Sequence, residues 1–307
     1  MDEIIRTEYL CKYFRNVKAV DGISISIEKG EIYGFLGLNG AGKTTTIRML
    51  LGMISPTTGA SYLNGKLVTG GNPDLWTNVG NLVEIPYSYP DLTVSENLDI
   101  IRRLRFIKKK HIVNQIIERL GLDSYRNVIA RNLSLGNAQR LGLAKAMIHE
   151  PEILILDEPA NGLDPAGIVE IRVMLQYLAA EKGVTIFISS HILGEISRFA
   201  TRIGIIHEGR LILESGVNEV EKLRNQRLQV RTQDLTGAKA ILEQKGYSPI
   251  LTEEGLLEIH NTEAIQNPEN IASILVHSGF PPGLLKVEEE DLETFFLRVI
   301  SLKGGAA

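Results

Sequence analysis

The sequence lacks the features of a membrane-spanning or disulfide-stabilised protein. It contains no run of about eighteen apolar residues, so we expect no transmembrane helix. Its single cysteine, Cys11, cannot form a disulfide within the chain, and we expect a small buried thiol there rather than a reactive one. The acidic start, Met1-Asp2-Glu3, does not have a signal-peptide pattern. Together these absences predict a cytoplasmic protein that associates with a membrane only through partner subunits.

The charge balance argues against one further class of partner. The net charge is −4 at pH 7, whereas dedicated nucleic-acid binders carry strongly basic patches, so we expect no nucleic-acid partner. The 307 residues are enough for two domains, and a hydrophobic content of 44% is enough for a real core.

A glycine-rich segment predicts a phosphate-binding loop. Residues 37–44 fit the spacing G-x-x-x-x-G-K-[ST], between an apolar strand at 31–36 and a helix at 44–51. Glycines allow consecutive backbone N–H groups to face one anion, and a helix N-terminus adds partial positive charge. A chance glycine-rich turn is the weaker alternative. We therefore expect a nucleoside triphosphate to bind here, to Gly37, Asn39, Gly40, Ala41, Gly42, Lys43, Thr44 and Thr45.

Two adjacent carboxylates follow a second apolar run. Residues 152–156 have the length and composition of a parallel strand buried on both faces, and Asp157 and Glu158 come directly after it. Open α/β sheets bind their ligands at this end of the strands. One carboxylate can hold Mg²⁺ together with the Thr44 hydroxyl, while the other activates water. For Asp157 alone, capping of the next turn is an alternative.

With three further motifs, the chain resembles the nucleotide-binding subunit of an ATP-binding-cassette (ABC) transporter, over about residues 3–222. The segment 133–140 stands where this family has its signature L-S-G-G-Q-x-x-R, so the resemblance assigns Ser134, Leu135, Gly136 and Asn137 to the ATP of a partner subunit. Asn161-Gly162-Leu163-Asp164 matches the D-loop, with Asp164 as its acidic residue. His191, after the apolar strand 185–188, matches the switch histidine.

Departures from the family pattern favour one branch. Glu84 stands where the family usually has glutamine, Leu135 replaces the first signature glycine, and Asn137 replaces the signature glutamine. This combination resembles ATPases that export bacitracin-like and lantibiotic peptides. A general drug or lipid exporter, an importer and a non-transport ABC ATPase are the alternatives. The cargo itself is not readable, because a separate membrane protein would contact it.

The resemblance also implies a mechanism and partners. Two subunits pack head to tail as a homodimer, with each ATP between one phosphate loop and the partner's signature, on the cytoplasmic face of the membrane and bound to separate transmembrane permease subunits. Glu158 is the expected general base and His191 the contact to the γ-phosphate. Phe14 occupies the adenine-stacking position, with Tyr13 as the runner-up and a plain core aromatic as the alternative.

Mg²⁺ is expected to be held by Thr44, Asp157 and Glu84. Glu84 differs from the usual glutamine because it adds a full negative charge near other carboxylates and the triphosphate. Like charges repel, so we expect Mg²⁺ or a cationic side chain beside it.

The fold expected is α/β: a P-loop nucleotide-binding domain at 1–225, with a helical subdomain at about 85–134, and a small α+β domain at 226–307. Within the second domain, strands at 228–231, 250–251, 256–259 and 284–287 alternate with helices at 237–245 and 268–277. That order, β-α-β-β-α-β plus a terminal helix, is ferredoxin-like. Within the first domain, Ser95 is the expected N-cap of a helix.

A basic run follows that helix start. A solvated face is the simpler interpretation, and contact with anionic lipid headgroups is the functional one. The run consists of Arg102, Arg103, Arg105, Lys108, Lys109 and Lys110.

Overall fold

The computed structural model describes residues 3–84 and 87–304, so residues 1–2, 85–86 and 305–307 lie outside the described residues. It divides into two compact units. Asn218–Arg298 form the smaller unit, and the other described residues form the larger one. Each unit has its own hydrophobic core. The domain boundary after residue 225 stays a prediction.

A six-stranded sheet in the order β11-β10-β4-β9-β8-β7 forms the centre of the larger unit. Its strands are parallel except β11, which pairs antiparallel at one edge. Every residue of β4, β8 and β9 is buried, as predicted for parallel strands covered on both faces. The bounds are β4 Ile32–Leu36, β7 Val79–Leu82, β8 Ile153–Asp157, β9 Thr185–Ser190, β10 Arg202–His207 and β11 Arg210–Gly216.

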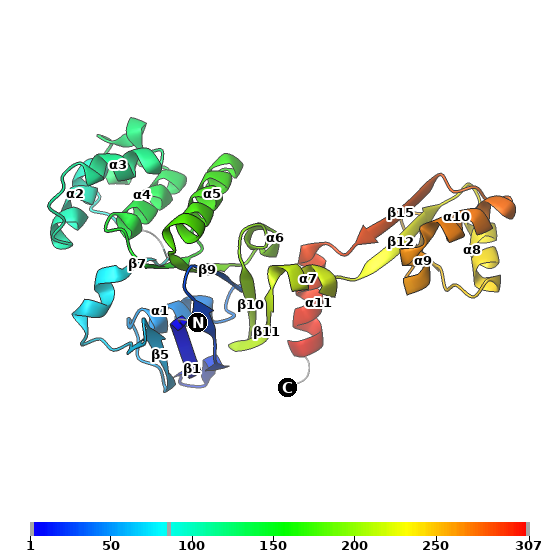
Figure 1. The fold of residues 1–307 in the computed structure, drawn as a ribbon, viewed down its shortest axis with the longest axis horizontal. Helices are drawn as coiled ribbons and strands as arrows, with labels where there is room; N and C mark the ends of the chain where they lie inside the picture. Colours follow the sequence, from blue (N-terminus) through cyan, green and yellow to red (C-terminus); the bar gives the residue numbers. More distant parts are fainter. Residues whose placement is uncertain (1–2, 85–86, 305–307) are drawn as a thin grey trace. The chain divides into compact units, whose positions relative to one another are not determined.

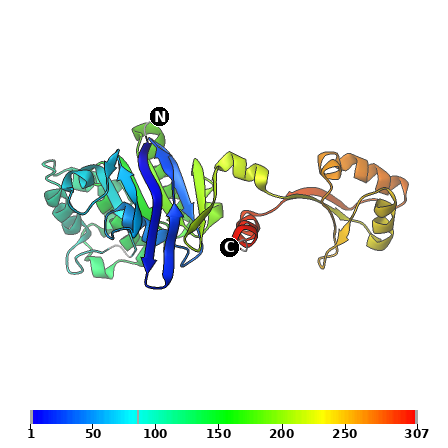
Figure 2. The same cartoon turned by 90° about the horizontal axis from the view of Figure 1, so that it is seen from below.

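An antiparallel sheet packs across from it, with β1 and β2 in dark blue in Figure 2. The helix α1 (Lys43–Leu50) contributes Ile47 and Leu50 to a core that also contains Ile5 of β1 and Phe35 of β4. Cys11 is buried in this region, as expected, and its sulfur accepts the backbone N–H of Gly22. The strands are β1 Glu3–Phe14, β2 Val17–Ile23, β3 Ser26–Glu28, β5 Thr58–Leu63 and β6 Lys66–Leu67.

A group of helices lies beside β7 (Figure 1). The expected helical subdomain contains α2 and α3, which pack on each other and on α4. The helices of the larger unit after α1 are α2 Val94–Leu104, α3 Ile112–Arg119, α4 Leu135–Met147, α5 Pro165–Lys182 and α6 Leu193–Ile196, and α7 (Val217–Leu223) follows β11. Short 3-10 turns are η1 Pro73–Asn78, η2 Asp123–Tyr125 and η3 Ala130–Asn132.

The helix α2 begins earlier than we predicted. Its N-cap is Thr93 and not Ser95, so that expectation was wrong. The Thr93 hydroxyl accepts the backbone N–H of Glu96, and the Glu96 carboxylate accepts the backbone N–H of Thr93, at 2.8 Å. This reciprocal capping box satisfies two backbone donors at the helix start. Ser95 could not form one, because the residue three positions after it is Leu98 and not Glu or Gln.

The smaller unit has the predicted α+β order with one added helix. Its antiparallel sheet runs β13-β14-β12-β15, and its core contains Leu228, Val230, Leu257 and Ile271. The expected hairpin pairs Leu251 with Leu257. The bounds are β12 Gln226–Arg231, α8 Leu235–Gln244, β13 Ile250–Leu251, β14 Leu257–Ile259, α9 Thr262–Gln266, α10 Pro268–His277 and β15 Leu284–Glu289, and the terminal helix is α11 Leu292–Gly304.

The capping box gives a direct stability test. Thr93→Ala should lower the free energy of unfolding by about 1 kcal/mol, because the backbone N–H of Glu96 loses its acceptor. Ser95→Ala is the matched control, and it should change the free energy by less than about 0.5 kcal/mol. Urea unfolding of both variants measures the difference. If Ser95→Ala lowered the free energy of unfolding as much as Thr93→Ala or more, Thr93 would not be the N-cap that stabilises this helix.

Candidate functional site

The phosphate loop joins β4 to α1 in the predicted strand–loop–helix arrangement. Gly42 is the N-cap of α1, with φ at 111°, and a Cβ on it would lie 2.4 Å from the carbonyl oxygen of Ala19. Only glycine fits that position. The backbone N–H of Gly37 donates to the carbonyl of Ser190, at 3.3 Å, which ties the loop to the end of β9. The start of α1 is thereby fixed where an anion can approach it.

Lys43 is held inside this loop. Its side chain is 6% exposed, its Nζ lies 3.2 Å from Glu158 Oε1, and it donates to the carbonyl of Gly37 at 2.7 Å. A buried ammonium needs such partners, since an unpaired one would be strongly destabilising. The Glu158 carboxylate and the Gly37 carbonyl thus contact the ammonium group that we expect to bind a triphosphate.

Asp157 joins α1 to two neighbouring strands. Its Oδ2 accepts the Thr44 hydroxyl at 2.8 Å, and its Oδ1 accepts the Ser189 hydroxyl at 2.5 Å. Ser189 Oγ also accepts the backbone N–H of Glu158, at 3.0 Å. Sequence reasoning missed Ser189 as a site residue, although its place at the end of a buried strand, two positions before His191, was a usable signal.

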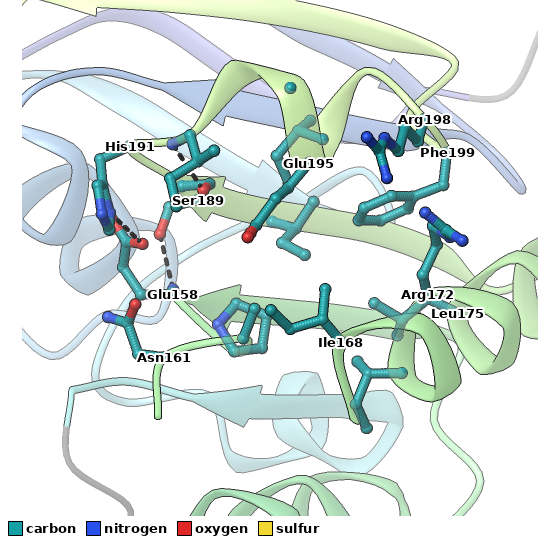
Figure 3. Close-up of a pocket in the computed structure, with 18 of the residues that line it drawn as sticks. Glu158, Asn161, Ile168, Arg172, Leu175, Ser189, His191, Glu195, Arg198 and Phe199 are labelled. Carbon is teal, nitrogen blue, oxygen red and sulfur yellow. Dashed lines mark hydrogen bonds and ion pairs between the residues drawn. The ribbon is translucent and has the colours of Figure 1, made fainter. Parts of the chain in front are cut away.

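Glu158 is the most constrained residue of the site. Its φ is +49°, a left-handed value that is rare and costly outside glycine. Its Oε2 lies 2.9 Å from His191 Nδ1, and Figure 3 shows both side chains turned towards each other. Its backbone carbonyl accepts the Gln139 amide at 3.2 Å, a link to α4 that the sequence did not indicate. The structure therefore brings Lys43, Glu158 and His191 together.

The signature residues form a separate group around the start of α4. Ser134 is its N-cap and accepts the backbone N–H of Asn137 at 3.3 Å. A Cβ on Gly136 would lie 2.8 Å from the carbonyl oxygen of Gly162, and one on Gly162 would lie 2.5 Å from the side chain of Leu135. The signature thus packs closely on the D-loop of its own chain, and Leu135 itself stays 59% exposed.

Asp164 ends the D-loop as the N-cap of α5, where it accepts the backbone N–H of Gly167 at 2.9 Å. Among the residues that the structure describes, no hydrogen bond or ion pair joins Ser134, Gly136 or Asn137 to the phosphate loop.

Glu84 pairs with Arg48 of α1. Its side chain is 55% exposed and its φ is +57°, so the backbone there is strained as it is at Glu158. The cation that we expected beside Glu84 is therefore the guanidinium of Arg48. Within residues 3–84 and 87–304, no three His, Cys, Asp or Glu side chains form a ready-made metal cluster.

Phe14 and Tyr13 differ in what holds them. Phe14, the last residue of β1, is 48% exposed, and Lys12 Nζ lies 5.2 Å from its ring centre. The Tyr13 hydroxyl donates to Asp21 at 2.8 Å, and this hydrogen bond raises the pKa of Tyr13. The half-exposed Phe14 face is therefore the one open to a stacking base.

A cavity of about 670 Å³ opens beside Glu158 and His191, between α5 and the end of β9 (Figure 3). Its walls are mostly apolar, with Ile168, Leu175 and Phe199 among the lining residues. Glu158 and His191, the expected catalytic residues, thus border this cavity.

Comparisons with known proteins agree with this geometry. The family described as ABC transporter matches residues 20–161. The bacitracin transport ATP-binding protein BcrA of Bacillus licheniformis is 39% identical over 302 residues, which cover 98% of each chain. The chain belongs to the ABC transporter ATP-binding proteins. The resemblance seen in the sequence, the P-loop α/β fold and the expected ATPase function are confirmed.

Two further similar proteins match only about three quarters of the length of the chain. The lantibiotic transport ATP-binding protein SrtF of Streptococcus pyogenes is 35% identical over 228 residues, 73% of this chain and 97% of that protein. A solved nucleotide-free ATP-binding cassette from an ABC transporter is 28% identical, covers 72% of this chain and 94% of its own, and has a TM-score of 0.63. BcrA matches along nearly the full length, so its likeness includes the smaller unit. No helix in the described part of this chain is both long and apolar enough to cross a bilayer.

The Glu84–Arg48 pair yields a prediction about Mg²⁺. Glu84→Gln should keep ATP binding and much of the basal hydrolysis, because Lys43 and Asp157 are untouched. It should raise the Mg²⁺ concentration for half-maximal hydrolysis severalfold, since one negative charge near the metal is lost. A Mg²⁺ titration of ATPase activity measures this.

Glu8→Gln is the matched control, because Glu8 is a similarly exposed carboxylate paired with Arg6 at 3.0 Å. That variant should titrate like the unmodified chain. A Mg²⁺ curve of Glu84→Gln that also overlays the unmodified one would remove Glu84 from the metal site.

Proposed function

We propose that this ATPase energises the export of a bacitracin- or lantibiotic-like peptide through a separate permease, at the cytoplasmic face of the membrane. The relatives named for bacitracin and lantibiotic transport support this cargo class. The departures at Glu84, Leu135 and Asn137, which resemble the same branch, support it independently.

The observation that carries the mechanism is the network around Asp157 and Glu158. We infer that the Thr44 hydroxyl and the Asp157 carboxylate, which are 2.8 Å apart, would hold Mg²⁺, and that this ion would neutralise negative charge on the phosphates. Lys43 then exchanges Glu158 for the β- and γ-phosphates. The released Glu158 carboxylate accepts the proton of the attacking water, while His191 orients that water and the γ-phosphate. In this scheme ATP itself frees the base.

The second half of the site comes from another copy of the chain, packed head to tail. Within the described residues, Ser134, Gly136 and Asn137 make no hydrogen bond to the phosphate loop of their own chain, and the start of α4 offers a second anion-binding terminus. Leu135 beside the signature and Leu38 in the phosphate loop are both exposed, at 59% and 41%. Burial of these leucines against a second copy would add to the binding energy of the γ-phosphate.

The permease is proposed to dock in a groove that follows Glu84. This permease groove, of about 360 Å³, lies between β7 and the helices α2 and α4. At one wall Lys145 donates to the backbone carbonyl of Tyr87 and to Ser88, each at 2.8 Å, and burial lowers its pKa to about 8. A short permease helix suits such a groove, which is lined by apolar side chains and by two cationic residues, Lys145 and Arg105. The remaining lining residues include Met53, Leu82, Val83, Ile101 and Leu104.

The general base is tested by Glu158→Gln. This variant should bind ATP but lose at least about 100-fold in turnover, because no carboxylate remains to accept the proton. It should also accumulate as an ATP-bound dimer in size-exclusion chromatography. Lys43→Ala should instead weaken ATP binding itself. Normal turnover of purified, permease-coupled Glu158→Gln would refute the assignment.

Two comparisons complete that test. Glu181→Gln, an exposed carboxylate on α5, should behave as the unmodified chain. His191→Ala should lower turnover without abolishing ATP binding, and a wild-type rate would leave His191 a structural role only. In cells that carry the permease, Glu158→Gln should abolish resistance to the exported peptide. Unchanged sensitivity to every bacitracin- and lantibiotic-type peptide would contradict the proposed cargo, but not the ATPase mechanism.

A further inference from the structure

The helix α2 ends in a cap that normally uses glycine. The backbone N–H of Ile107 donates to the carbonyl of Arg102 at 2.9 Å, and that of Phe106 donates to Arg103 at 3.0 Å. This pair of bonds is a Schellman motif, in which the residue after the cap takes a left-handed conformation. Here that residue is Phe106, with φ at +54°.

Phe106 is costly at this position in two ways. A bulky side chain is rare at positive φ, and its ring is 89% exposed to water. Glycine would satisfy the same cap without either cost. The turn therefore does not explain why phenylalanine occupies this position, and we look for a role of the exposed ring. Strained backbone of this kind is found most often at functional sites.

The loop that presents the ring is held firmly by two members of the basic run. Arg102 is buried, with its Nε donating to Asp99 at 2.7 Å and its Nη1 to the carbonyl of Ile107 at 2.6 Å. Arg105 donates to the carbonyl of Trp76 at 2.5 Å. These two arginines act inside the fold, so they belong neither to a solvated face nor to a lipid contact.

Three exposed lysines follow the ring directly. Lys108, Lys109 and Lys110 lie between α2 and α3, on the surface. An exposed aromatic next to clustered lysines is the combination that suits a membrane interface, where the ring enters the headgroup layer and the ammonium groups meet anionic lipid. The chain as a whole has a net charge of −4, which would repel an anionic membrane. The three lysines supply a local positive charge that offsets this repulsion.

We propose that the Phe106 loop, residues 106–110, binds the surface of an anionic lipid bilayer. Leu104, two residues earlier, lines the permease groove. The loop therefore borders the surface that faces the permease and, with it, the membrane. That orientation rests on the proposed function, whereas the lipid affinity of the loop does not.

The test is co-sedimentation of the full chain with vesicles, without ATP or permease. The chain should bind vesicles containing phosphatidylglycerol, release them at high salt, and ignore pure phosphatidylcholine. Lys108→Gln, Lys109→Gln and Lys110→Gln should each lower the partition coefficient by about fivefold. Phe106→Gly should lower it by about tenfold, while the unfolding midpoint stays level or rises, because glycine suits the cap.

Matched controls come from the same chain. Tyr9 is also an exposed aromatic at positive φ, 78% exposed with φ at +43°, so Tyr9→Gly should leave lipid binding unchanged. A second control is the triple variant with Lys66→Gln, Lys222→Gln and Lys245→Gln, which removes three positive charges elsewhere. It should lower vesicle binding far less than the triple variant with Lys108→Gln, Lys109→Gln and Lys110→Gln.

Several results would overturn the proposal: equal binding to neutral and anionic vesicles, or loop variants that bind like the unmodified chain. Capture of the permease by a chain that ignores anionic vesicles would also overturn it, and would assign Phe106 to the protein interface instead. Conversely, vesicle binding that depends on Phe106, together with no permease capture, would contradict the proposed function and leave the lipid contact standing.

Discussion

The ion pair between Lys43 and Glu158 is the contact on which the site depends. The ammonium group is 6% exposed and the carboxylate 18%, so each charge needs an opposite charge beside it. Removing one partner leaves a buried, uncompensated charge, which is strongly destabilising. In the proposed mechanism, the phosphates of ATP would replace Glu158 as the partner of Lys43, so the ammonium group would keep an opposite charge beside it. The same exchange would free the Glu158 carboxylate to act as the base.

Glu158 is also connected to the surfaces that are proposed to meet other proteins. Its backbone carbonyl accepts a hydrogen bond from the Gln139 amide of the signature helix, whose first turn packs on the D-loop at Gly162. On the opposite side, Arg48 of the phosphate-loop helix holds Glu84, the residue before the permease groove. In the proposed mechanism, a shift of α1 on phosphate binding would therefore be felt both at the dimer surface and at the groove. The links from Glu158 to the signature helix and from α1 to Glu84 consist of hydrogen bonds, an ion pair and close backbone contacts. Such tightly packed contacts can transmit a small displacement.

Much of this architecture was predictable, because local sequence determines it. Apolar runs gave β4, β8 and β9, glycine spacing gave the phosphate loop, and Pro268 with Gly279 bracketed α10. Contacts between distant segments were not predictable: Ser189 reaches Asp157 only because β8 and β9 are neighbours in the sheet. Likewise, nothing local shows that Arg102 and Arg105 turn inwards, or that Thr93 is positioned for the capping box ahead of Ser95.

The most direct test of this account is a structure of the chain with ATP and Mg²⁺, compared with the nucleotide-free form. The account predicts that Lys43 Nζ leaves Glu158, from which it is 3.2 Å away without nucleotide, and contacts the β- and γ-phosphates. It also predicts that Thr44 and Asp157, which share a hydrogen bond of 2.8 Å, would hold the added Mg²⁺. A structure with ATP in the phosphate loop and both contacts unchanged would contradict the claim that the nucleotide frees the base.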